Sequence, residues 1–312
     1  MSFLPTPPDP SKPGSFPPES SSGSEIPIAP PPWTLSAKGW ILSYSDTDAN
    51  TDTDNAPSQN PNNTPETLQN VLPPGAYHPF ETPHPSALEK LSNGSSQFQK
   101  SWLNSVVIIR YEDTDVGPYD ELIFVPGRAV NPNTGKKDMR ITTIYVSTDA
   151  SVWNGRRNWN IPKHRARFEW TPVGNDTALR VYHPEDSPAP LDPSIPFFTV
   201  LLKGSSLPKI SLPIIAPLPL VQPPLAKSRY PPGIQDATIA TDDPENGREN
   251  PWLSTRPSFK GRWGLTYPDA LQDGENTLQY HGDGIGFPRV KIRSVGVYFE
   301  GIVGFPASDV AS

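Results

Sequence analysis

Proline limits what this chain can fold into more than any other residue, because 43 of its 312 residues are proline. Proline lacks a backbone N–H donor and fixes its own φ, so it ends helices and is confined largely to sheet edges. The apolar stretch 207–225 is rich in proline, which forbids a helix and restricts it to an edge strand or an extended packing chain. That stretch would either cover a ligand cavity or serve as plain packing.

The composition divides the chain into a folded part and polar segments. Residues 1–32 consist mainly of proline, serine and glycine and are expected to form a disordered tail. A proline-rich ligand for a partner domain is the alternative for this tail. Residues 46–70 and about 226–251 are polar and are expected to be flexible insertions, although repeated Asp-x-Asp in the first resembles a calcium loop without its glycine and glutamate. The remainder, 33–306, is predicted to be a single β-rich domain.

Several function classes are disfavoured by composition. The chain has no cysteine, which excludes disulfides and thiolate chemistry, and its net charge of −7 argues against a nucleic-acid surface. There is no apolar run of about eighteen residues and no visible signal peptide, so we expect neither membrane association nor secretion and predict a cytoplasmic protein. The five histidines lack zinc-ligand spacing, and no Walker loop occurs. We therefore expect no metal and no cofactor.

Short strands dominate the predicted elements. One helix is predicted within residues 85–102. Strands are predicted at residues 33–44, 106–111, 121–125, 140–147, 165–170, 179–182, 196–203 and 290–300. Strands of this length joined by tight turns favour an antiparallel barrel or sandwich.

Residues 153–170, W-N-G-R-R-N-W-N-I-P-K-H-R-A-R-F-E-W, contain the candidate functional residue, Lys163. Asn154-Gly155 predicts a turn, and Pro162 bars a helix just before it. A lysine is ordinarily a solvated surface residue. A lysine held by a rigid proline beside buried aromatic rings would lose hydration, which favours the free amine. A free amine can attack a ketone and form a Schiff base, which then withdraws electrons from the substrate.

The alternation of residues after Pro162 leaves two placements open for the lysine. Ala166, Phe168 and Trp170 share one face of the predicted strand, so an unbroken strand would put Lys163 on the charged face and His164 on the apolar one. Either that charged face lines a polar cavity, or the lysine belongs to a turn and escapes the alternation. Proline is poorly tolerated inside a paired strand, which favours the turn.

These motifs resemble those of the acetoacetate decarboxylase superfamily. The matching residues are Gly155-Arg156, then Trp159-x-x-Pro162-Lys163, and upstream Gly117-Pro118-Tyr119-Asp120-Glu121. The resemblance is strongest between about residues 106 and 170. It implies a mainly β fold, an antiparallel lipocalin-like barrel or cone with few short helices.

The resemblance also implies roles for individual residues. Lys163 falls on the Schiff-base lysine of the family, whose activated lysine is a known example of this chemistry, and Glu121 falls on a glutamate of the family's cavity. Two positions depart from the family pattern. His164 replaces a second lysine, and Arg157 replaces the glutamate of a Gly-Arg-Glu turn, which puts acetoacetate in doubt as the substrate.

Further side chains are candidates for handling a substrate. Glu121 and His164 could move protons, although Glu121 could also be an exposed carboxylate at a strand start. Arg140 and Arg156 could hold a substrate carboxylate in fork geometry, or bind backbone carbonyls, which is favoured for Arg156. Tyr119 and Trp159 complete the predicted substrate-binding set.

The predicted function is therefore that of a Schiff-base-forming lyase. Its substrate would be a small keto acid or polyketide-like carbonyl compound, decarboxylated or cleaved in aldol-type chemistry through Lys163. A non-catalytic small-molecule-binding protein on the same fold is the alternative. A scaffold that recruits partners through its proline-rich tail is a third hypothesis, and assembly into a homo-oligomer stays open.

Overall fold

The computed structural model describes residues 26–45, 72–99, 103–216, 218–225, 251–273, 276–277 and 280–311. The predicted insertion 46–70 and nearly all of 226–251 lie outside this part of the chain, as does most of the tail. Residues 26–32, at the end of the tail, pack against the fold: Ala29 is buried and its N–H donates to Asn154 Oδ1 at 2.8 Å. Burial of this segment against the fold offsets its ordering entropy.

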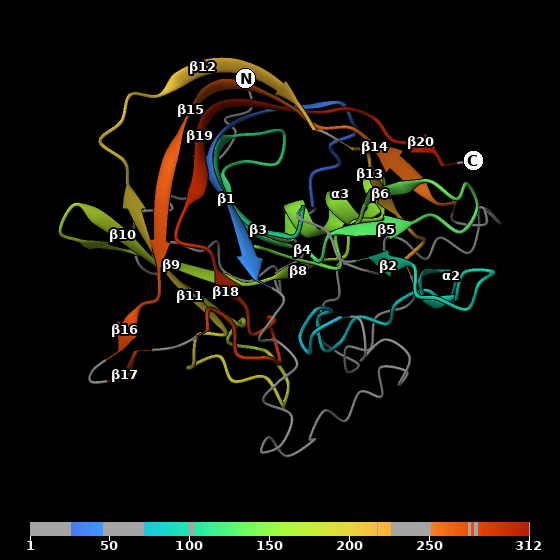
Figure 1. The fold of residues 1–312 in the computed structure, drawn as a ribbon, viewed down its shortest axis with the longest axis horizontal. Helices are drawn as coiled ribbons and strands as arrows, with labels where there is room; N and C mark the ends of the chain where they lie inside the picture. Colours follow the sequence, from blue (N-terminus) through green and yellow to red (C-terminus); the bar gives the residue numbers. More distant parts are fainter. Residues whose placement is uncertain are drawn as a thin grey trace.

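Among the described residues, the main sheet has twelve strands and curls into a nearly closed barrel (Figure 1). Its order is β8-β7-β4-β3-β1-β19-β15-β11-β10-β9, with β12 paired to β15 and β18 to β1. The strands are β1 (Trp33–Ser45), β3 (Ser105–Asp113), β4 (Tyr119–Val125), β7 (Thr143–Val146), β8 (Lys163–Arg165), β9 (Arg167–Val173), β10 (Asp176–Tyr182), β11 (Phe198–Gly204), β12 (Ile210–Ile215), β15 (Ser258–Asp269), β18 (Lys291–Ile292) and β19 (Gly296–Phe305). The predicted mainly β, barrel-like fold is confirmed.

The two outermost strands of that order, β8 and β9, are consecutive in the chain and are separated by Ala166 alone. Neighbouring strands of the main sheet pair antiparallel except β7 and β8, which pair parallel with Ile144 opposite Lys163. Parallel neighbouring strands need a long crossover connection, and helix α3 (Asp149–Trp159) provides it between β7 and β8.

A second sheet lies beside α3 (Figure 1). Its order is β2-β5-β6-β13-β14-β20. The strands are β2 (Phe98–Gln99), β5 (Arg128–Val130), β6 (Lys137–Met139), β13 (Leu220–Gln222), β14 (Leu253–Thr255) and β20 (Asp309–Val310), while β16 (Gln272–Asp273) and β17 (Asn276–Thr277) form a separate hairpin. The proline-rich stretch thus becomes two strands, and β12 pairs with β15 alone, as expected of an edge strand.

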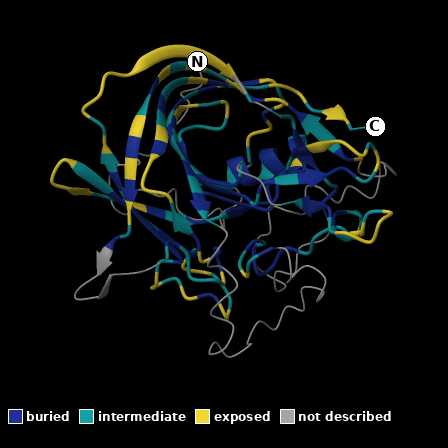
Figure 2. Ribbon diagram, in the orientation of Figure 1, coloured by how far each residue is buried: buried dark blue, intermediate teal, exposed yellow. Residues whose placement is uncertain are grey.

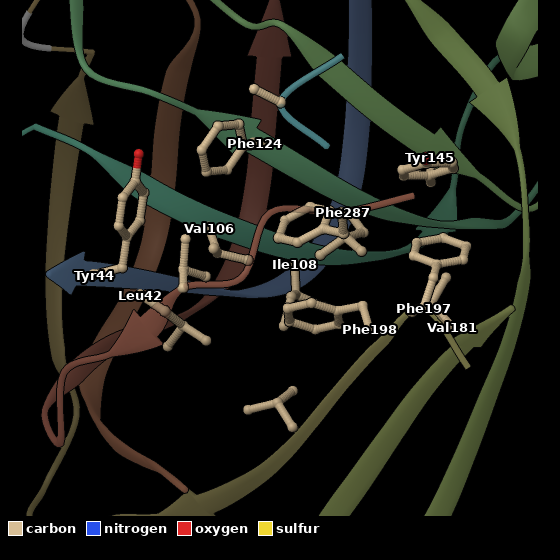
Figure 3. Close-up of a cluster of buried hydrophobic side chains, with 14 of the residues drawn as sticks. Leu42, Tyr44, Val106, Ile108, Phe124, Tyr145, Val181, Phe197, Phe198 and Phe287 are labelled. Atoms are coloured by element: carbon tan, nitrogen blue, oxygen red, sulfur yellow. The ribbon is translucent and has the colours of Figure 1, made fainter. Parts of the chain in front are cut away.

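Two hydrophobic cores occupy opposite faces of β3, β4 and β7. The first, the barrel core, includes Val106, Ile108, Leu122, Phe124, Tyr145, Val181, Phe198 and Phe287 (Figure 3). The second, the helix core, includes Ile109, Tyr111, Ile123, Ile144, Val146, Val152 and Trp159. Every residue of β4 is buried because the strand lies between the two cores (Figure 2).

Helix α3 replaces the turn that Asn154-Gly155 predicts. Thr148 caps its first turn by accepting from the Ser151 N–H at 3.3 Å, and Asn160 ends it in the left-handed conformation at φ 54°. Asn154 donates to Pro27 O and accepts from Ala29, so tertiary contacts hold it inside the helix. Tertiary packing therefore overrides the local turn preference.

Other predicted elements differ in extent. The helix within 85–102 is reduced to α2 (Pro85–Leu88), and the strand 140–147 begins only at Thr143. The strand 290–300 is divided into β18 and β19. No helix in the described part of the chain is long and apolar enough to cross a membrane.

Candidate functional site

Lys163 lies at the first position of β8, and its amine is buried between the sheet and α3. The residue is 4 % exposed, and Nζ donates to Glu121 Oε2 at 2.8 Å and to Ser151 Oγ at 3.1 Å. Glu121 comes from β4 and Ser151 from α3, so three elements meet at one nitrogen. Of the lysines in the described ranges, this is the only buried one. Desolvating an ammonium is costly without such a carboxylate partner.

Two tyrosines complete the surroundings of this ion pair. The Lys163 amine lies 5.3 Å from the centre of the Tyr119 ring, and the Tyr111 hydroxyl donates to Glu121 Oε1 at 3.3 Å. Burial and the neighbouring Glu121 carboxylate raise the pKa of both phenols well above the usual value. Both hydroxyls therefore stay protonated at neutral pH, and that of Tyr111 donates to the pair through Glu121.

Lys163 belongs to strand β8 and not to a turn before it, so its side chain takes part in the alternation of the strand. Lys163 and Arg165 both face α3, and Arg165 donates to Asp149 Oδ2 at 3.1 Å. The interruption comes later, at Ala166, whose N–H bonds Val146 O at 2.9 Å before β9 begins. The preferred turn placement is wrong, because Pro162 precedes the strand and leaves Lys163 free to pair with Ile144.

His164 projects to the opposite face of β8, because successive strand residues alternate. Its Nε2 lies 2.8 Å from Glu81 Oε2, which also accepts from Arg156 at 2.8 Å. Burial would raise the pKa of Glu81, but the Arg156 guanidinium and the His164 hydrogen bond lower it to about 2. The structure thus separates His164 from the Lys163 amine and ties Arg156 to an internal carboxylate.

Two histidines that are distant in sequence, His78 and His183, gather around His164. The His78 ring stacks on it at 3.8 Å, and the His183 ring meets His78 edge-on at 6.1 Å. Burial, together with the charge of neighbouring His164, lowers the pKa of His183 to about 4 and that of His78 well below normal. The rings of His78 and His183 are therefore uncharged at neutral pH. Within the described ranges, no group of side chains has the arrangement of a metal site.

A separate hollow has Pro162 in its wall. Its wall includes Arg140, Glu81, Pro162 and Gln222, whereas Lys163 is not part of it. Arg140 is 2 % exposed and donates to Gln97 Oε1 at 2.9 Å. Of the two predicted carboxylate-binding arginines, only Arg140 therefore faces a hollow.

Trp159 lies in the helix core instead of beside a hollow. Its ring meets that of Trp33 edge-on at 4.9 Å, and its indole N–H donates to Pro306 O at 2.9 Å. Sequence reasoning missed Ser151, Glu81, His78 and His183 as members of these clusters. No local motif marks them, because each is brought in by pairing between distant segments.

No family model matches the sequence, and a search of curated proteins found no match. Solved structures do show similarity. An acetoacetate decarboxylase from Legionella pneumophila aligns at 14% identity over 91% of this chain and 88% of its own, with a TM-score of 0.48. The enduracididine biosynthesis enzyme MppR, solved with pyruvate, aligns at 12% identity over 94% and 95%, with a TM-score of 0.48.

A third solved structure is an acetoacetate decarboxylase-like enzyme from Sphingomonas wittichii. It aligns at 11% identity over 90% of this chain and 92% of its own, with a TM-score of 0.42. At such identities the similarity concerns only the course of the backbone.

Proposed function

We propose that the protein is a Schiff-base-forming lyase that acts through Lys163 on a small keto acid or polyketide-like carbonyl compound. The observation that carries the proposal is the buried Lys163–Glu121 pair, with Nζ and Oε2 2.8 Å apart. Lysines are rarely buried without a function, and functional amines are commonly found in desolvated surroundings beside a carboxylate.

The pair provides both groups that imine formation requires. Glu121 takes a proton from Nζ, and the free amine adds to the substrate carbonyl carbon to give a carbinolamine. Loss of its hydroxyl as water leaves an iminium. The bond between the α-carbon and the group beyond it then breaks. Its electron pair forms the enamine double bond while the iminium π electrons move to nitrogen, and carbon dioxide or a carbonyl fragment departs. Protonation of the resulting enamine and attack by water release the product and restore the amine.

Ser151 and Tyr119 would position the amine during these steps. The Ser151 hydroxyl lies 3.1 Å from Nζ and comes from the helix that covers the lysine. The Tyr119 ring, 5.3 Å from Nζ, stabilises a positive charge on that nitrogen in both ammonium and iminium. The same surroundings therefore accommodate the charge before and after condensation.

Borohydride trapping tests this proposal directly. The protein is incubated with a panel of ketones and keto acids, reduced, digested and analysed by mass spectrometry. A covalent mass increase on the peptide containing Lys163 is expected, and Lys163→Met should abolish it. Lys209→Met is the matched control, because Lys209 is exposed and pairs with Glu300 on the surface.

Two results would contradict the lyase. Labelling of other lysines with equal yield would show that Lys163 has no special reactivity. Ligand binding that persists in Lys163→Met without any mass increase in the wild type would instead indicate a non-catalytic binding protein.

A further inference from the structure

Arg140 carries a buried charge that has no ion-pair partner in the described part of the chain. It is 2 % exposed, yet no described carboxylate lies within 4 Å of its guanidinium. Other buried cations of the fold do have partners, since Arg156 pairs with Glu81 and Lys163 with Glu121. A buried charge without a counter-ion is strongly destabilising, so such groups are rare unless a ligand completes them.

The hydrogen bonds of Arg140 are also incomplete. One terminal nitrogen donates to Gln97 Oε1 at 2.9 Å, and the other reaches Val130 O only at 3.4 Å. Nε is buried and has no partner among the described residues. A guanidinium has five N–H donors in a fixed fork, so several stay available. Burial accordingly lowers the pKa of Arg140 to about 10.

Two aromatic rings hold the guanidinium in place. Its carbon lies 4.7 Å from the centre of the Trp252 ring and 5.1 Å from that of Phe98. Stacking fixes the plane of the fork and leaves its edges for hydrogen bonds. The site is thus preorganised by β2 and by the residues that directly follow β6 and precede β14 of the second sheet (Figure 1).

The wall of the hollow beside Arg140 contains both polar and apolar residues. The polar ones include Arg140, Tyr77 and Glu81, and the apolar ones include Pro223, Pro224 and Leu225. A ligand with a charged head and a short apolar tail fits such a wall. The Glu81 carboxylate lies in the same wall, so a singly charged head is favoured over a doubly charged phosphate.

We propose that this hollow binds the carboxylate of a short-chain organic acid, with the carboxylate paired to Arg140 and the tail against the prolines. A planar carboxylate matches the guanidinium fork in two parallel hydrogen bonds. The site is separate from the Lys163 amine, because Lys163 is not part of the wall of the hollow. The proposal therefore stands independently of the lyase chemistry.

Butyrate is the probe, and calorimetric titration of the full chain with thermal unfolding is the measurement. We expect butyrate to bind and to raise the melting temperature. Arg140→Met should weaken binding at least about tenfold, because one charged hydrogen bond contributes on the order of 1.5–3 kcal/mol. Arg140→Lys keeps the charge without the fork and should also bind more weakly. Arg180→Met, on β10, is the matched control and should bind as the wild type does.

The alternatives give distinct results. Butyramide has the same tail without the charge and should not bind, and inorganic phosphate should bind more weakly than butyrate. Equal butyrate affinity in Arg140→Met, or no binding by the wild type at concentrations of tens of millimolar, would overturn the proposal, as would stronger binding of phosphate. Lys163→Met should keep butyrate affinity, so failure of the lysine chemistry and failure of this site are distinguishable.

Discussion

The side chain of Lys163 lies directly against Gly155 of helix α3. A methyl group on this glycine would come within 2.6 Å of Lys163 Cδ and 2.7 Å of Cε. No side chain larger than hydrogen fits there while the lysine keeps its position. The glycine inside α3 is therefore explained by the path of the lysine.

Gly155→Ala should displace the lysine without unfolding the helix. Alanine favours a helix over glycine by about 1 kcal/mol, but its methyl group must push Lys163 away from Glu121. We expect the borohydride-trapped adduct to fall at least about tenfold while circular dichroism stays unchanged. Gly204→Ala is the control, since nothing lies within 4 Å of its added carbon. An unchanged adduct yield would show that the contact does not position the amine.

The Lys163–Glu121 pair should show strong energetic coupling. Removing either partner leaves a buried group unpaired, so Lys163→Met and Glu121→Gln should each cost about 3–5 kcal/mol of unfolding free energy. The double variant should cost less than the sum, because it leaves no unpaired charge. Urea unfolding of the four proteins measures the coupling. Additive costs would mean that the two groups do not interact in solution.

His183 should make the protein sensitive to mild acid. Its pKa is about 4 in the fold and 6.5 in the unfolded chain, so the unfolded chain binds more protons between these values. The contribution is fully present above pH 6.5 and is lost as the pH falls towards 4, amounting to roughly 3 kcal/mol. His183→Leu should flatten this part of the stability profile, measured by urea unfolding from pH 7 to 4.

The neighbours of His183 determine how this result is interpreted. The ring faces His78, Tyr145 and Phe197, with His164 behind His78. Neither of its nitrogens has a partner among the described residues, so leucine removes no hydrogen bond. An unaltered pH profile in His183→Leu would assign the acid sensitivity to another group, and His84→Leu serves as a comparison at a less buried histidine.

Glu81 should govern stability in stronger acid. Its pKa is about 2 in the fold and 4.5 in the unfolded chain, so its contribution is complete above pH 4.5 and is lost as the pH falls towards 2. Glu81→Gln should remove this dependence and also destabilise the protein near neutrality, because Arg156 loses its buried partner. Acid titration followed by tryptophan fluorescence measures both effects, and an unchanged neutral-pH stability would contradict the pairing.

The sequence predicts those parts of the fold that local composition determines. The run of β-branched residues at 106–111 becomes part of β3, and Lys163 and Glu121 do meet. Helix α3 escapes prediction because Asn154 and Gly155 prefer turns locally, while the hydrogen bond between Asn154 and Ala29 comes from a distant segment. The histidine cluster escapes for the same reason, since His78 and His183 are about a hundred positions apart.

The single residue between β8 and β9 has a mechanical consequence for the site. The circumference of the barrel is interrupted between these two strands, and the covalent chain crosses that gap at Ala166. One residue spans at most about 3.6 Å, so the ends of β8 and β9 cannot separate at this gap. Because Lys163 lies three positions before Ala166, the covalent chain itself holds the barrel closed beside the lysine.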